Sequence, residues 1–164
     1  MKSMLNWKRG AFSSTCRIFS GEETIGELTN KAFSQTALGL IRNKRFLFET
    51  KGLFKQETQI LEGVSHQVLG SISYNSLKSR ATIQFKDRTL YWKYDNRWQS
   101  KWILFDDQGI LMKFAGGSSK GTIACEEEDD LLVLTGMFVT NYYQQAMIAI
   151  LVAVFIPIWL SQVT

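Results

Sequence analysis

The sequence has almost no proline or histidine, few cysteines, and no charged residue after residue 130. Proline occurs once, at Pro157, so residues 1–130 can form uninterrupted strand ladders. Histidine also occurs once, at His66, and a lone histidine cannot build a zinc site without suitably spaced partners. The two cysteines, Cys16 and Cys125, lie far apart and outside any CxxC motif. We therefore expect free thiols in a reducing compartment.

Catalytic and nucleotide-binding signatures are also missing. Ser65 beside His66 is not the signature of a catalytic triad. Residues 116–120, a Gly-Gly-Ser-Ser-Lys run, lack the spacing of a phosphate-binding loop and precede an expected strand, so we interpret them as a turn. Residues 1–9 contain no apolar segment of the kind that directs secretion. We predict a non-enzymatic protein that is not secreted and needs no cofactor and no metal.

What the chain does have is many short runs of β-branched and aromatic residues. With 164 residues, of which 45% are hydrophobic, it is long and apolar enough for one domain with a core. Polar turns separate the runs at regular spacing, which is typical of a sandwich or a barrel. Gly26, Gly70 and Gly121 lie inside three runs and favour a sheet that bends repeatedly, as a closed barrel must. The expected strands are 15–19, 24–28, 36–41, 46–50, 56–62, 68–74, 81–85, 90–94, 101–105, 110–114 and 121–125.

The pattern changes at residue 126. Residues 126–130 are all acidic, and negative charge is favourable at the start of a helix. Asp129 or Asp130 is suited to cap that start. The run lacks the alternating carboxylates of a calcium-binding loop, so a helix start is the favoured interpretation. The residues that follow are apolar all round, and such a helix must be enclosed by protein or by lipid.

We divide the uncharged segment near Gln144. Residues 1–145 are predicted to form the barrel, with a core helix at about 130–145, and residues 146–164 an apolar tail. Residues 146–160 have no polar side chain but fall short of the ~20 residues that span a bilayer upright. They either continue the core helix or anchor the chain in a membrane, and Pro157 is expected to end or kink the helix. The predicted core-helix contacts are Leu131, Leu134, Met137, Phe138 and Tyr142.

A basic stretch precedes these elements. Between residues 78 and 101 the cations outnumber the carboxylates, and Trp92 and Trp98 lie among them. Such a face suits anionic lipid or nucleic acid, although a solvated sheet face is the favoured interpretation. The candidate lipid-binding residues are Lys78, Arg80, Lys86, Arg88, Lys93, Arg97 and Lys101.

The order of several segments points to a known family. These segments are residues 68–73 (Val-Leu-Gly-Ser-Ile-Ser), 79–83, 98–109, 120–123 and the apolar helix from Leu131. In this order they resemble the tubby C-terminal-like superfamily, in its LURP-one-related and phospholipid-scramblase-like branch, over about residues 12–145. The resemblance implies a twelve-stranded barrel threaded by a hydrophobic C-terminal helix. It also implies membrane association, although no phosphoinositide-binding motif of the tubby proteins matches this chain.

Two functions follow from these patterns. The first is a non-enzymatic, membrane-associated barrel on the cytoplasmic side, tail-anchored by residues 146–160, which binds anionic headgroups or acts in a scramblase-like way. The alternative is a soluble structural or protein-interaction module whose C-terminal helix lies entirely inside the barrel. Membrane lipids are the expected partner, nucleic acid is not expected, and the residues identify no protein partner.

Overall fold

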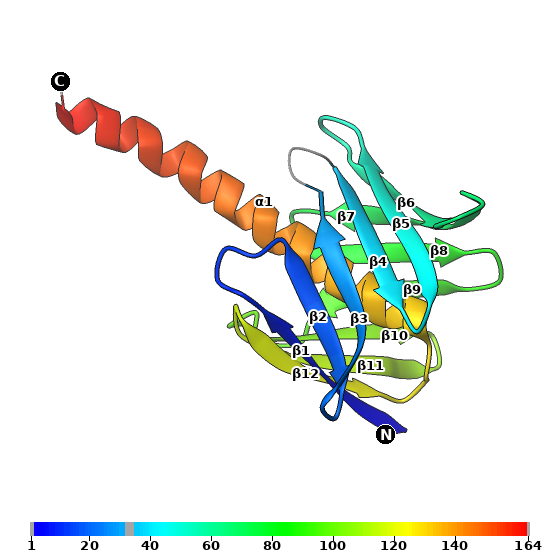
Figure 1. Cartoon of the computed structure of the whole chain (residues 1–164). Helices are drawn as coiled ribbons and strands as arrows, with labels where there is room; N and C mark the ends of the chain where they lie inside the picture. The colour runs from blue at the N-terminus through cyan, green and yellow to red at the C-terminus, as the bar shows by residue number, and fades with distance from the viewer. Residues whose placement is uncertain (1, 32–34, 164) are drawn as a thin grey trace.

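The computed structural model describes residues 2–31 and 35–163, in which twelve antiparallel strands form a closed barrel. Each strand pairs with its neighbour in sequence, and β1 pairs with β12 to close the barrel around one helix (Figure 1). The predicted fold class, mainly β with a closed antiparallel barrel of about twelve strands around a hydrophobic C-terminal helix, is confirmed. The strands are β1 (Ser3–Arg9), β2 (Thr15–Ser20), β3 (Glu23–Asn30), β4 (Thr36–Ile41), β5 (Lys44–Lys51), β6 (Glu57–Glu62), β7 (Val68–Asn75), β8 (Arg80–Phe85), β9 (Thr89–Tyr94), β10 (Lys101–Asp106), β11 (Gly109–Gly116) and β12 (Lys120–Cys125).

Glycines allow the wall of the barrel to bend. Gly26 lies opposite Ile18, and Gly70 lies opposite Ile60, each beside an irregularity in strand register. A Cβ atom at Gly26 would lie 2.7 Å from the carbonyl oxygen of Leu40 on the neighbouring strand. A Cβ atom at Gly70 would approach the carbonyl oxygen of Gln84 just as closely. The close backbone approach expected of these strand glycines is therefore present.

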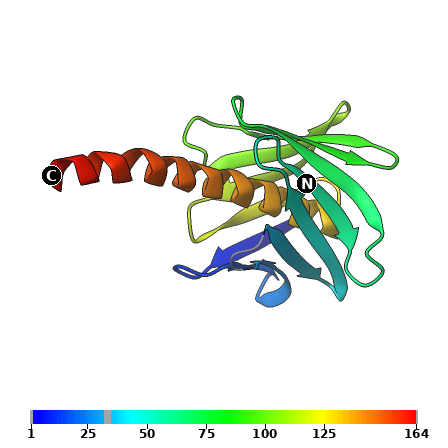
Figure 2. The same cartoon turned by 90° about the horizontal axis from the view of Figure 1, so that it is seen from above.

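The helix α1 (Asp130–Val163) runs through the barrel and projects from it (Figures 1 and 2). Its first turns fill the lumen, where Phe138 stacks on Phe48 of β5 with ring centroids 4.6 Å apart. The Nε1–H of Trp92 on β9 donates a hydrogen bond of 3.2 Å to the Oγ1 of Thr140. The residues of α1 that lie buried in the barrel are Leu132, Val133, Leu134, Thr135, Gly136, Met137, Phe138, Val139, Thr140, Asn141 and Tyr143.

Pro157 does not end the helix, so that part of the expectation is wrong. The 34 residues of α1 continue through Pro157 to Val163, which corresponds to about 50 Å of helix. A proline inside a helix removes one backbone hydrogen bond and crowds the preceding turn. Here the surrounding residues 147–163 are exposed, so no packed neighbour opposes the local adjustment.

Consecutive strands run in opposite directions, so the turns and loops that connect them lie alternately at the two ends of the barrel. We call the end where α1 begins the base and the end where it leaves the mouth. The base consists of residue 2, turns 21–22, 42–43, 63–67, 86–88, 107–108 and 126–129, and the strand and helix ends beside them. The mouth consists of residues 31 and 35, loops 10–14, 52–56, 76–79, 95–100 and 117–119, and the strand ends beside them.

Candidate functional site

The mouth holds the helix firmly at the point where it leaves the barrel. The hydroxyl of Tyr142 donates a hydrogen bond of 2.6 Å to the Oε1 of Gln56 in the β5–β6 loop. The hydroxyl of Tyr143 donates to the carbonyl oxygens of Asn75 and Arg80, at the two ends of the β7–β8 loop. From Met147 onward every described side chain of α1 is exposed. An 18-residue stretch of the helix lies wholly outside the barrel and is apolar enough to cross a membrane.

Charge is divided unequally between the two ends. Among the residues that the structure describes, the mouth carries nine cations against two carboxylates, a net charge of +7. The base carries five cations against eleven carboxylates, a net charge of −6. The cations of the mouth are Arg9, Lys31, Lys51, Lys55, Lys78, Arg80, Arg97, Lys101 and Lys120, and its acids are Glu57 and Asp95.

The apolar part of α1 therefore leaves the barrel through its positive end. In the sequence no lysine or arginine lies near this part of the helix, because residues 131–164 are uncharged. Closure of the barrel brings these cations, from four loops and five strand ends, to the same face. A basic surface around an apolar helix is the arrangement expected at an anionic membrane.

The seven basic residues predicted from the sequence do not form one face. Lys78, Arg80, Arg97 and Lys101 lie at the mouth and are exposed. Lys86 and Arg88 lie in the β8–β9 turn at the base, because one strand carries the chain from one end to the other. Lys93 is the next-to-last residue of β9, near the mouth, with its Nζ 5.1 Å from the ring centroid of Phe105.

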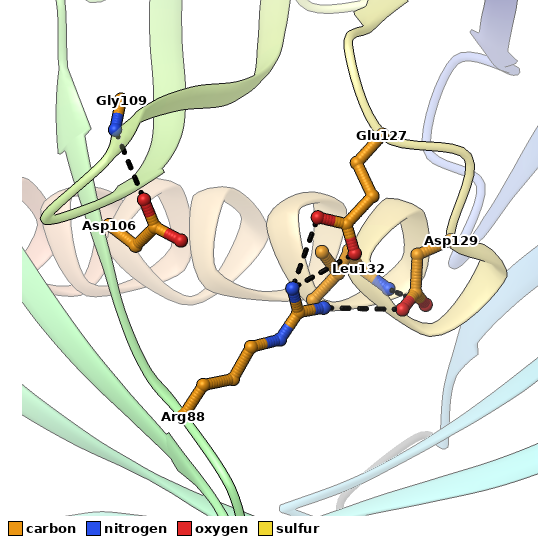
Figure 3. A network of polar contacts seen from close by, with 6 residues as sticks. All are labelled: Arg88, Asp106, Gly109, Glu127, Asp129 and Leu132. Atoms are coloured by element: carbon orange, nitrogen blue, oxygen red, sulfur yellow. Dashed lines mark hydrogen bonds and ion pairs between the residues drawn. The ribbon is translucent and has the colours of Figure 1, made fainter.

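Arg88 has a structural partner at the base. Its guanidinium contacts Glu127 at 2.9 Å and Asp129 at 3.4 Å (Figure 3). The Oδ1 of Asp129 accepts a 3.1 Å hydrogen bond from the backbone N–H of Leu132, so Asp129 caps the helix as expected. Asp130 pairs with Arg42 and with Lys44 of the β4–β5 hairpin. The acidic run thus fixes the start of α1 to two turns of the barrel.

No metal site appears in the described part of the chain. Residues 2–31 and 35–163 contain no group of three or more histidines, cysteines and carboxylates placed to hold a metal ion. His66 is exposed in the β6–β7 turn at the base. At the start of α1, Glu127, Asp129 and Asp130 instead pair with arginine and lysine side chains of the base.

The two tryptophans of the basic stretch differ in position. Trp92 is fully buried in the core, where its ring stacks on Tyr143 at a centroid distance of 5.0 Å. Trp98 is exposed in the β9–β10 loop of the mouth. Of the two, Trp98 alone is placed to meet a partner.

A cavity of about 570 Å³ opens at the mouth, between α1 and the wall of the barrel. Asn30, Lys31 and Gln56 line its barrel side, and Ala146 and Ala149 line its helix side. The side-chain amide of Asn141, 5% exposed, also faces this cavity and forms no hydrogen bond with the residues described. The cavity therefore combines polar side chains with the apolar surface of the helix, which suits an amphiphilic ligand.

The predicted core-helix residues lie where α1 meets the barrel. Leu134, Met137 and Phe138 are buried, and Leu131 and Tyr142 are partly buried against the same core. The mouth cations outside residues 78–101 were not predicted from the sequence. In a barrel of consecutive hairpins every second loop lies at the same end. Summing the charges over alternate loops of the sequence would therefore have identified these cations. The missed cations are Arg9, Lys31, Lys51, Lys55 and Lys120.

Comparison of the chain with protein-family models, curated proteins and solved structures finds no match. The resemblance to the tubby-like superfamily thus stays a prediction, and the geometry of the mouth is the basis on which a function is inferred.

Proposed function

We propose that this protein is a non-enzymatic, membrane-associated barrel, held at a bilayer by the exposed part of α1 with its mouth facing anionic headgroups. The observation that carries the proposal is that the apolar half of α1 is uncovered and leaves through the cationic end. A soluble module would need residues 147–163 to be covered by protein, and no part of the described barrel covers them.

Energetics favour lipid around the exposed helix. Each leucine, isoleucine, phenylalanine or valine at the centre of a membrane helix contributes roughly −0.3 to −0.6 kcal/mol to insertion. The exposed part of α1 consists largely of such residues and contains no charge. Each lysine or arginine held near an anionic surface adds about 1 kcal/mol. The apolar helix and the cationic mouth therefore favour the same orientation of the barrel, with its mouth toward the bilayer.

The charge pattern also favours one side of the membrane. Cationic segments next to membrane helices are retained on the cytoplasmic side. The mouth supplies these cations although the sequence next to the helix does not. The proposal accordingly places the barrel in the cytoplasm. It does not include lipid translocation by α1, because the first half of the helix is packed inside the barrel.

Fractionation of cells that express two forms of the chain tests this function. The full chain should pellet with membranes and resist extraction by high salt and alkaline carbonate. A chain stopped after Gln145 should lose that resistance, because it lacks the exposed apolar part of α1. Circular dichroism on the soluble product then establishes whether the barrel has folded. A full chain that stays soluble without detergent or lipid contradicts the proposal.

A further inference from the structure

The loops of the mouth carry large apolar side chains at their tips. Outside α1, five described large hydrophobic residues are at least 89% exposed, and all five lie at the mouth. At the base, the most exposed large hydrophobic residue described is Val64, at 79%. The five residues are Phe12, Leu53, Phe54, Leu77 and Trp98.

Several of these tips are next to a cation in the sequence. Lys55 follows Phe54, Lys78 follows Leu77, and Arg97 precedes Trp98. Polar and small residues normally occupy exposed loop tips, and aromatic side chains with adjacent cations are typical of membrane interfaces. Apolar tips of this kind can enter the acyl boundary while the neighbouring cations contact phosphate groups. The tips therefore match a lipid interface better than water.

The buried part of α1 continues directly into its exposed apolar part. Tyr143 is buried and bound to the β7–β8 loop, and Met147 is already exposed. The helix is continuous between them, so no flexible linker separates the barrel from the apolar segment. If that segment lies in a bilayer, the loops around it reach the bilayer surface.

We propose that the loops at 10–14, 52–56, 76–79 and 95–100 insert their apolar tips into the interfacial layer of an anionic phospholipid bilayer around α1. This inference rests on the proposed function, since α1 must first lie in the membrane. It adds a second contact that fixes the depth and orientation of the barrel. The barrel then rests on the lipid surface rather than standing away from it on its helix.

Site-specific fluorophores test the inference on the full chain. Single cysteines are introduced as Phe54→Cys and Leu77→Cys at the mouth, Val64→Cys at the base and Ile150→Cys in α1. Each is labelled with a small environment-sensitive dye and reconstituted into vesicles of phosphatidylcholine and phosphatidylserine. Cys16 and Cys125 are buried, and burial raises the pKa of both thiols, so the introduced cysteine reacts first. Lipids with a nitroxide near the headgroup end of the chain then quench any dye in the interface.

The expected result is strong quenching at positions 54 and 77, and none at position 64, the matched exposed site at the base. Quenching at position 150 without quenching at 54 and 77 overturns the inference and leaves the proposed function intact. Absence of quenching at position 150 contradicts both. Blue-shifted but unquenched emission at positions 54 and 77 would assign the tips to a protein interface. Equal quenching at position 64 would show that the mouth does not face the bilayer in preference to the base. Either result overturns the inference.

Discussion

At the scale of single residues, Gly136 sets how closely α1 approaches the wall of the barrel. A Cβ atom there would lie 2.3 Å from the Cζ of Phe114 on β11. Phe114 cannot move away easily, because it is buried and stacks on Trp102 at a centroid distance of 5.7 Å. The close contact lets a helix fit inside a lumen that the wall side chains already occupy.

Gly136→Ala should therefore destabilise the protein although alanine is the better helix former. Overpacking of a close-packed core costs typically 1–3 kcal/mol, against about 1 kcal/mol gained from helix propensity. Denaturant unfolding of the full chain in micelles measures the difference. With Phe114→Leu also present, the cost of the alanine should shrink, and an unchanged cost would show that the contact is not its cause.

Cys16 makes stability depend on pH in the alkaline range. Burial of Cys16 raises the pKa of its thiol from 9.0 to about 11, although the nearby Arg9 opposes the rise. The unfolded chain loses this proton from about pH 9, whereas the folded chain keeps it to about pH 11. The stability that the neutral thiol supplies is thus complete below pH 9 and is lost as pH rises toward 11.

We expect the difference in unfolding free energy between the natural chain and Cys16→Ala to change by roughly 2 kcal/mol from pH 8.5 to 11. The natural chain loses stability relative to the variant, because the variant has no thiol to ionise. Denaturant unfolding in micelles at several pH values measures this difference. A difference that stays constant with pH would exclude a raised thiol pKa.

At the scale of elements, the start of α1 is fixed by a cap and by ion pairs. Asp129 accepts a hydrogen bond from the backbone N–H of Leu132 and contacts Arg88. Loss of an N-cap costs about 1 kcal/mol, and the partly exposed ion pair adds less. The free energy of unfolding of Asp129→Ala should thus fall by about 1–2 kcal/mol, as measured by denaturant titration.

Glu128→Ala is the matched control for that change. Glu128 is exposed and accepts no hydrogen bond from the residues described, so its removal should change stability by less than about 0.5 kcal/mol. Equal losses for the two variants would mean that the negative charge of the run, and not the cap, stabilises the helix start.

Most elements could be predicted because the wall of the barrel alternates buried and exposed side chains. Eleven strands lie within two residues of the predicted runs. The twelfth, β1, was not predicted, because polar and basic residues surround its two buried side chains, Leu5 and Trp7. Its role in closing the barrel depends on pairing with β12, more than 100 residues away in sequence. Local pattern carries no information about such a pairing.

At the scale of the whole molecule, the main feature is the charge difference between mouth and base. The sequence predicted an apolar segment and a basic stretch, and four of the seven basic residues lie at the mouth. It did not predict that Lys86 and Arg88 lie at the base, because that requires knowing which turns share an end of the barrel. The exposed loop tips were missed for the same reason.

Reversal of one charge at each end tests whether this difference guides membrane association. Lys78→Glu at the mouth should slow association of the full chain, diluted from detergent, with phosphatidylserine vesicles by about ten-fold at low salt. Lys86→Glu is an equal charge change at an exposed lysine of the base and should have little effect. High salt should remove the difference between the variants. If both variants associate with the vesicles equally slowly, the net charge of the protein, and not its distribution between the two ends, controls the association rate.

The continuity of α1 has a mechanical consequence. Because the helix is continuous and its first half is packed inside the barrel, we expect the two parts to turn together. If the helix tilts in a bilayer, the barrel tilts by the same angle. The acidic base, which lies farthest from the exposed part of the helix, is then displaced sideways. If α1 inserts into a membrane as proposed, the direction of the barrel reports the tilt and rotation of the helix.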